Sequence, residues 1–331
     1  MDNLYWEYAG TRYKRKIQAT LAAGRHYESI QCHAFDDSFL SYDFTAEPPQ
    51  TLSELVDERV KQIRDKYSYI KFWFSGGADS TTVLNAFLRN NIHIDEIICY
   101  TQSLTDNHDH IANYDLTEFT IPYLLKVKND LPKTKINIMR FGREHYEKVL
   151  NEDFWLTKMS MLDPRHLYIP NIRGKNYCNL FCDMDPQVSF NGQTWVDTIW
   201  DTSNLEEMAG YRNIELFYTS SDLPQLHAKQ CHFMKNFYKS NTKFTTKDFK
   251  NIMRNHLRDK AVAVEHHSYN KDVQPTRQDN FISQRSRLML RDDPNSDLLQ
   301  KIKYNISLTV DKIPLYRLSR GYPVATLDLG V

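Results

Sequence analysis

The stretch "IKFWFSGGADSTTVLNAFLRNN", from Ile70 to Asn91, decides the predicted fold. An apolar run ends in two adjacent glycines, and apolar residues then recur at helical spacing. This order predicts a buried strand over Ile70–Phe74, a tight turn, and a helix over Thr81–Asn90. The chain has only 10 glycines, so a pair at this junction indicates a turn that side chains would obstruct.

The same alternation of strand and helix continues on both sides of the turn. Further strands are predicted over Ile94–Thr101 and Lys135–Phe141, with a helical segment over Asp115–Pro132 between them, and a fourth strand near Asn179–Cys182. Such alternation is typical of an α/β fold, here a parallel twisted sheet of about five strands with helices on both faces. Ligands bind such sheets at the carboxyl ends of the strands.

Helix signals divide the chain into three predicted parts. A short helix is expected over Thr11–Gly24, and a second one begins after Thr51 or Ser53 and carries a regular apolar stripe. Another is expected towards the end of Asn213–Lys239. We predict an N-terminal extension (1–50), an α/β domain (51–240) and a mainly helical C-terminal region (241–331).

Composition places the chain among ordinary globular proteins. It has 331 residues, 41% of them hydrophobic and 25% charged, and a formal net charge of zero, which argues against a broad nucleic-acid-binding surface. No apolar run approaches the ~20 residues needed to span a bilayer, and the N-terminus lacks the apolar core of a secretion signal. The 5 scattered cysteines suggest free thiols. We therefore expect a cytoplasmic protein with no membrane partner, in the cytoplasm of the infected host cell if a virus encodes it.

The turn has the chemistry of an anion site. The first amides of a helix have no intrahelical acceptors, and the helix dipole makes them favourable to phosphate. Ser75, Ser80 and Thr81 add hydroxyl donors, and Asp79 would repel a phosphate unless Mg²⁺ lay between them. The chain contains neither G-x-x-x-x-G-K-[ST] nor G-x-G-x-x-G. The alternative is a tight strand-to-helix turn with an ordinary polar cap.

The segment "FSGGADSTTVL", Phe74 to Leu84, resembles the S-G-G-x-D-S fingerprint of the PP-loop superfamily, the N-type ATP pyrophosphatases. The likeness extends by pattern over about 51–240. Two later segments, "CDMDPQVSF" and "FYTSSDLPQLHAKQCHFMK", are similar to asparagine-synthase-like PP-loop proteins from bacteriophage genomes.

The resemblance implies an ATP-dependent ligase that adenylates its substrate with Mg²⁺ and releases AMP and pyrophosphate. It implies that a carbonyl or carboxyl oxygen is activated for attack by ammonia or an amine. On this basis the nucleotide would be bound by Ser75, Gly76, Gly77, Asp79, Ser80 and Thr81, with Tyr100 and Thr101 near the adenine. Asp79 would have a catalytic role and would bind the metal together with Asp185.

A basic side chain should help to neutralise the departing pyrophosphate. Arg173 and Lys229 are the predicted catalytic cations, and for each the alternative is a solvated surface charge. The predicted partners are ATP and an unidentified small-molecule or nucleobase acceptor. About 70 residues before the loop are too few for a glutaminase domain, so a separate ammonia-donating partner is an option, as is a homodimer.

Two other functions stay open at this stage. One is a nucleotide-binding viral protein without turnover. The other is an enzyme that inserts sulfur into a nucleobase or tRNA, because Cys178 and Cys182 form a pair of the type that thiolation enzymes use. The same pair, with Cys231 and His232, also permits a less favoured zinc site.

Overall fold

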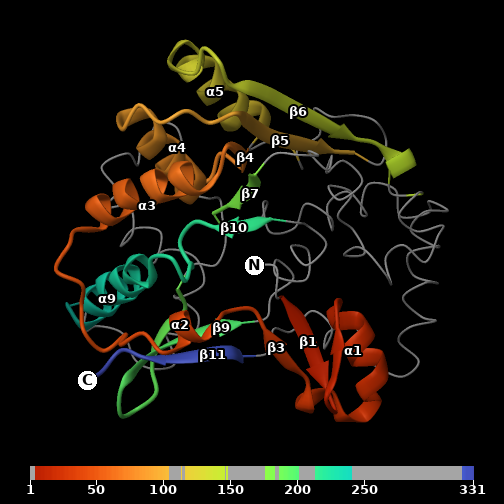
Figure 1. Ribbon diagram of the computed structural model, residues 1–331, viewed down its shortest axis with the longest axis vertical. Helices are drawn as coiled ribbons and strands as arrows, with labels where there is room; N and C mark the ends of the chain where they lie inside the picture. The colour runs from red at the N-terminus through yellow and green to blue at the C-terminus, as the bar shows by residue number, and fades with distance from the viewer. Residues whose placement is uncertain are drawn as a thin grey trace.

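The structure is a computed structural model of the chain. It describes residues 4–103, 113, 116–145, 147, 176–182, 186–200, 213–240 and 323–331. Within these ranges the strands form one parallel and two antiparallel sheets (Figure 1).

The parallel sheet has the architecture that the sequence predicts. Its five strands run in the order β10 (Ile214–Leu216), β7 (Tyr177–Phe181), β4 (Tyr69–Trp73), β5 (Glu96–Gln102) and β6 (Lys135–Phe141). Each neighbouring pair is parallel. Four of these strands overlap the predicted segments, and β10 is an addition of only three residues.

The helix α3 (Leu52–Lys66) begins where its sequence signal lies. The Thr51 hydroxyl accepts a hydrogen bond from the Glu54 amide (3.2 Å), and the Glu54 carboxylate accepts one from the Thr51 amide (2.8 Å). This capping box satisfies two amides that the first turn would leave unpaired. The apolar stripe of α3 is fully buried: Leu52, Leu55, Val56, Val60 and Ile63.

Three further described helices follow α3 along this part of the chain. They are α4 (Ala78–Arg89), α5 (Ile121–Val127) and α9 (Pro224–Ser240). A π-helical turn (Leu116–Thr120) precedes α5, which starts near Pro122 as predicted, and a 3₁₀ turn (Lys128–Asp130) follows it.

Helices α3, α4 and α5, with Leu226 at the start of α9, pack on one face of the parallel sheet. Their shared core includes Ile70, Phe72 and Phe74 of the β4 segment, together with Cys178 and Leu180 of β7. The opposite face carries a second apolar cluster, made of Trp73, Ile98, Phe181, Ile214 and Leu216. The helices expected on that face, and most of the predicted helical region 241–331, lie outside the described residues.

The N-terminal sheet corrects one prediction. Its order is β2 (Thr11–Tyr13), β1 (Tyr5–Tyr8) and β3 (Gln31–His33), and it packs with α1 (Lys16–Ala23), followed by a 3₁₀ segment (Gly24–Ser29). The helix expected over Thr11–Gly24 thus starts later, because Thr11–Tyr13 pairs with β1 instead. Its end at Gly24 is confirmed, where φ is +55°.

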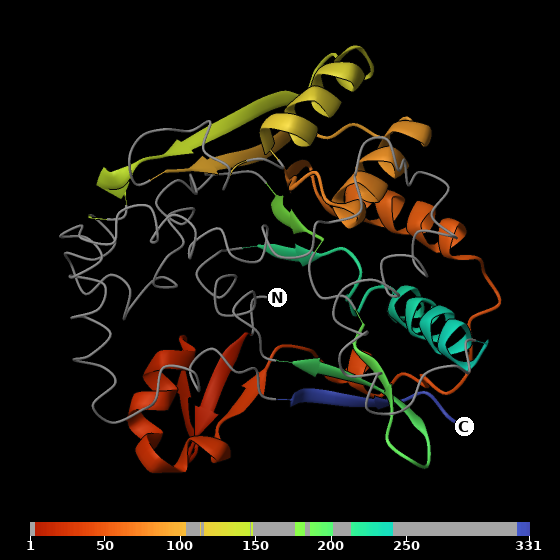
Figure 2. The same cartoon turned by 180° about the vertical axis from the view of Figure 1, so that it is seen from behind.

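The third sheet brings the C-terminus back to the middle of the chain. β11 (Pro323–Asp328) pairs antiparallel with β9 (Trp195–Trp200), which pairs with β8 (Val188–Phe190). This sheet shares a core with α9 and the short α2 (Asp37–Leu40). Helix α9 therefore lies between α3 on one side and the β11-β9-β8 sheet on the other (Figure 2). No helix in the described ranges is long and apolar enough to cross a bilayer.

Candidate functional site

The double glycine lies where the chain changes direction across the parallel sheet. From β4 the chain goes outward to β5 and β6, and it later returns to β7 and β10 on the other side of β4. In open parallel sheets, ligands bind outside the carboxyl ends of the strands at such a reversal. The carboxyl end of β4 leads into Ser75-Gly76-Gly77, and that of β7 leads into Cys182. The topology thus puts the loop at the favoured ligand position.

Gly76 is required by both conformation and packing. Its φ is +72°, a left-handed conformation that residues with a Cβ adopt at a cost. A Cβ at this position would lie 2.0 Å from Thr120 Oγ1, which itself donates a hydrogen bond to the Ser75 carbonyl (3.0 Å). The π-helical turn before α5 therefore fixes the course of the loop.

Hydroxyl groups organise the rest of the turn. Gly77 is the N-cap of α4, and its amide donates to Ser75 Oγ (3.2 Å). Ser75 Oγ lies 3.1 Å from Ser80 Oγ, which also donates to the Gly77 carbonyl (3.2 Å). Because hydroxyl groups rotate, both serine side chains can turn towards a bound anion.

The start of α4 is an electropositive helix end. Its first main-chain hydrogen bond runs from the Thr81 amide to the Gly77 carbonyl (2.9 Å). The amides of Ala78, Asp79 and Ser80 precede that bond and have no acceptor within the helix. The Thr81 hydroxyl is buried and has no hydrogen-bond partner in the described structure.

Asp79 lies in the first turn of α4 and is partly exposed. Its main-chain carbonyl accepts a hydrogen bond from the Tyr218 hydroxyl (3.1 Å), which connects the loop to the segment after β10. Burial, and secondarily the Asp79 carboxylate, raise the pKa of Tyr218 well above its usual value. Tyr218 is therefore a permanent hydrogen-bond donor that holds Asp79 in place.

Tyr100 and Thr101 lie at the same edge of the sheet as the loop. Trp73 of β4 pairs with Ile98 of β5. Ser75 lies two residues after Trp73, and Tyr100 lies two residues after Ile98, so both follow the paired residues in the same direction. The Tyr100 ring packs at 5.7 Å from that of Phe141. Thr101 is buried at the end of β5. The structure thus brings these two predicted residues to the edge that carries the loop.

Of the two predicted catalytic cations, the structure describes only Lys229, whose contacts are with the segment before α3 and not with the loop. The Lys229 ammonium pairs with the Glu47 carboxylate (2.7 Å) and donates to the Pro48 carbonyl (3.2 Å). Arg173 and the predicted metal ligand Asp185 lie outside the described residues. The catalytic roles of Lys229 and Arg173 and the metal-binding role of Asp185 stay predictions.

The cysteines do not assemble the zinc arrangement that their spacing permits. Cys178 is buried in the core between the parallel sheet and its helices, where burial raises its pKa strongly. Cys231 belongs to a different core, between α9 and the β11-β9-β8 sheet. His232 Nε2 lies 2.9 Å from the Phe44 carbonyl oxygen. Cys182, partly exposed, is the one member of the set at the carboxyl edge of the sheet.

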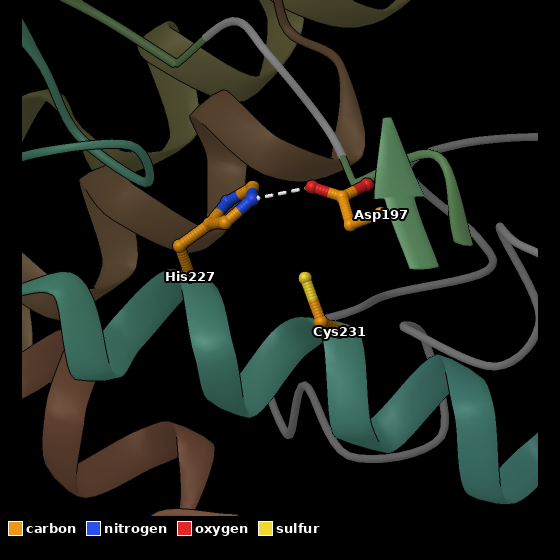
Figure 3. A group of neighbouring side chains, drawn as sticks. All are labelled: Asp197, His227 and Cys231. Atoms are coloured by element: carbon orange, nitrogen blue, oxygen red, sulfur yellow. Dashed lines mark hydrogen bonds and ion pairs between the residues drawn. The ribbon is translucent and has the colours of Figure 1, made fainter. Parts of the chain in front are cut away.

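A second group of polar side chains, of which only Cys231 figured among the predicted ligands, lies between α9 and β9 (Figure 3). His227 Nε2 lies 2.8 Å from Asp197 Oδ2, and the Cys231 thiol is beside them. Burial and then the Asp197 carboxylate raise the pKa of Cys231 well above its usual value, so this thiol is unsuited to nucleophilic attack. The spacing of His227 and Cys231, one helical turn, was visible in the sequence, whereas the approach of Asp197 depends on the position of β9.

Comparison with protein-family models, with curated proteins and with solved structures gives no match.

Proposed function

We propose that the protein is an ATP-dependent adenylating enzyme that converts ATP to AMP and pyrophosphate and so activates a carbonyl or carboxyl oxygen for attack by ammonia or an amine. One observation carries the proposal. The S-G-G-x-D-S segment forms the turn between β4 and α4, beside the reversal of strand order at the carboxyl edge of a parallel sheet. A glycine turn, an electropositive helix end and a ligand-binding edge thus coincide.

The β- and γ-phosphates of ATP would bind over this turn. The first-turn amides of Ala78, Asp79 and Ser80 supply fixed donors. The Ser75 and Ser80 hydroxyls, now 3.1 Å apart, would turn from each other to the phosphate oxygens. Because Gly76 is locked against Thr120, the donors are held in position before the nucleotide arrives.

The donor set also fits a magnesium ion on the nucleotide. Asp79 offers a partly exposed carboxylate next to the phosphate-binding amides, and Mg²⁺ prefers such oxygen ligands shared with substrate phosphates. When bound, the ion would neutralise charge on the departing pyrophosphate. Tyr218 would keep the main chain at Asp79 fixed while the carboxylate takes part in binding. Asp185 stays the predicted second ligand.

The reaction would proceed in two displacements. An oxygen of the acceptor attacks the α-phosphorus, the bond from that phosphorus to the bridging oxygen breaks, and pyrophosphate leaves with the electron pair. The amine then attacks the activated carbon, and AMP leaves. Donors fixed around the leaving group accelerate the first displacement because they need no reorganisation as charge develops. Tyr100 and Thr101, at the end of β5, would contact the adenine end of ATP.

The test is pyrophosphate release from Mg·ATP, measured with ammonium chloride and a panel of amino acids as acceptors. The Asp79→Asn variant should lose release by about 10²-fold or more, the scale of removing one preorganised electrostatic group. Asp65→Asn is the matched control, because Asp65 is an exposed carboxylate on α3. Equal release from the wild type and Asp79→Asn would refute the role of Asp79. Binding of Mg·ATP with no release on any acceptor would favour a nucleotide-binding protein without turnover.

One observation favours sulfur insertion as a second candidate. Cys182 follows β7 at the strand-order reversal, at the sheet edge that carries the loop, and is partly exposed. A cysteine at this edge is where a sulfur-inserting enzyme would need a thiol close to the activated nucleobase. If so, Cys182→Ser should abolish transfer, whereas Cys178→Ser should spare it, because Cys178 is buried in the core. Full activity in Cys182→Ser would remove this candidate.

A further inference from the structure

We propose that Asp197, His227 and Cys231 form a binding site for a divalent metal ion of the zinc type, which joins α9 to the β11-β9-β8 sheet. This site is separate from the proposed nucleotide site. All three side chains are buried, and one ligand atom from each lies within 4.8 Å of the others.

The three ligand side chains come from two elements of the fold, α9 and β9. His227 and Cys231 are one turn apart on α9 and point to the same side, and Asp197 faces them from β9 (Figure 3). Zinc bonds to nitrogen, oxygen and thiolate sulfur are about 2.0–2.3 Å long. His227 Nε2 and Asp197 Oδ2, now 2.8 Å apart, would therefore separate by roughly 0.5 Å around a tetrahedral ion. Small side-chain rotations suffice for this change.

The remaining atoms of two ligands are already held by neighbours. His227 Nδ1 lies 3.4 Å from the Thr219 hydroxyl, and Asp197 Oδ1 accepts a hydrogen bond from the Gln187 amide. These contacts leave Nε2 and Oδ2 directed at the centre of the group. Metal-binding histidines and carboxylates are commonly oriented in this way by a second layer of hydrogen bonds.

Charge and surroundings favour a soft divalent ion over Mg²⁺. One carboxylate, one thiolate and one neutral imidazole around a divalent ion make a neutral unit, which an apolar core tolerates better than an isolated charge. Mixed sulfur, nitrogen and oxygen donors suit zinc, whereas Mg²⁺ prefers oxygen alone. The rings of Phe39 and Phe44 lie 5.8 and 6.1 Å from the His227 ring and make part of its surroundings apolar. Three protein ligands leave one tetrahedral position for a water molecule.

The test uses the full chain, stripped of metal with a chelator and titrated with Co²⁺. We expect one equivalent to bind, with tetrahedral visible bands and a near-ultraviolet band from thiolate-to-cobalt charge transfer. Cys231→Ser should lose the charge-transfer band, and the matched control Cys32→Ser, on the N-terminal sheet, should retain it. Thr219→Val, which removes the contact to His227, should weaken Co²⁺ binding by about tenfold or more.

The wild-type spectrum by itself tests whether a thiolate binds the metal ion, even if a variant fails to fold. A spectrum with no thiolate band, or a band that survives in Cys231→Ser, would overturn the proposal and identify the group as a metal-free hydrogen-bonded cluster. Zinc should also raise the Tm of the wild type and not that of Asp197→Asn; a wild-type Tm indifferent to zinc would contradict the proposed joining of α9 to the sheet. None of these measurements involves ATP, so their outcome is independent of the outcome of the adenylation assay.

Discussion

Replacing Gly76 by alanine tests the geometry of the loop before any ligand is known. Two contributions should lower the free energy of unfolding of this variant, one from the backbone conformation and one from steric overlap. The left-handed φ of +72° costs an alanine about 1–2 kcal/mol. The new Cβ would meet Thr120 at 2.0 Å (Oγ1), 2.9 Å (Cβ) and 3.2 Å (Cα), and overpacking of this kind costs about 1–3 kcal/mol. We therefore expect a loss of about 2–5 kcal/mol in the free energy of unfolding.

Gly10 provides a matched control, because its φ is +75° and a Cβ there would meet no atom within 4 Å. Gly10→Ala should cost only the backbone part, about 1–2 kcal/mol. A domain of about 200 residues loses about 2–4 °C of Tm per kcal/mol, so thermal unfolding separates the two variants. Adding Thr120→Ala to Gly76→Ala removes the closest atom and should recover part of the loss. If Gly76→Ala were no less stable than Gly10→Ala, the close contact with Thr120 would be refuted.

Other predictions concern stability. Burial alone would raise the pKa of Glu215, but Arg59, Tyr67 and Lys66 outweigh burial and lower it below its ordinary 4.5. The resulting stabilisation is complete above about pH 4.5 and is lost as the pH falls through the lowered pKa. Glu215→Gln leaves the buried Arg59 without its main countercharge and should lower the free energy of unfolding by about 3–5 kcal/mol near pH 7. Urea unfolding should show a smaller difference from the wild type at acid pH. A deficit that does not change with pH would contradict this. Thr51→Ala should cost about 1 kcal/mol through loss of the α3 capping box, and a cost near zero by the same method would show the cap to be dispensable.

Local signals in the sequence were sufficient for four of the five strands of the main sheet and for its first helices. The Thr51–Glu54 box starts α3, the apolar run from Ile70 gives β4, and Lys135–Phe141 gives β6. In each case the pattern that identifies the element lies within its own residues and does not depend on a distant segment. The position of the double glycine between strand and helix was predictable for the same reason.

Long-range pairing explains what the sequence did not reveal. The residues of β2 look compatible with a helix start, but pairing of Tyr13 with Trp6 makes them a strand. β11 joins β9 across more than a hundred residues, and no local pattern specifies that partner. The group around His227 depends on this sheet, because Asp197 reaches α9 only when β9 is in place. Short strands such as β10 carry too few residues to show a period.

The most direct test of the central claim follows the main-chain amides of the loop while Mg·ATP is added to ¹⁵N-labelled protein. The account predicts saturable shifts of the Ala78, Asp79 and Ser80 amides, and a markedly weaker response in Asp79→Asn. Unshifted loop amides at saturating nucleotide, or shifts confined to another helix start such as that of α3, would contradict it.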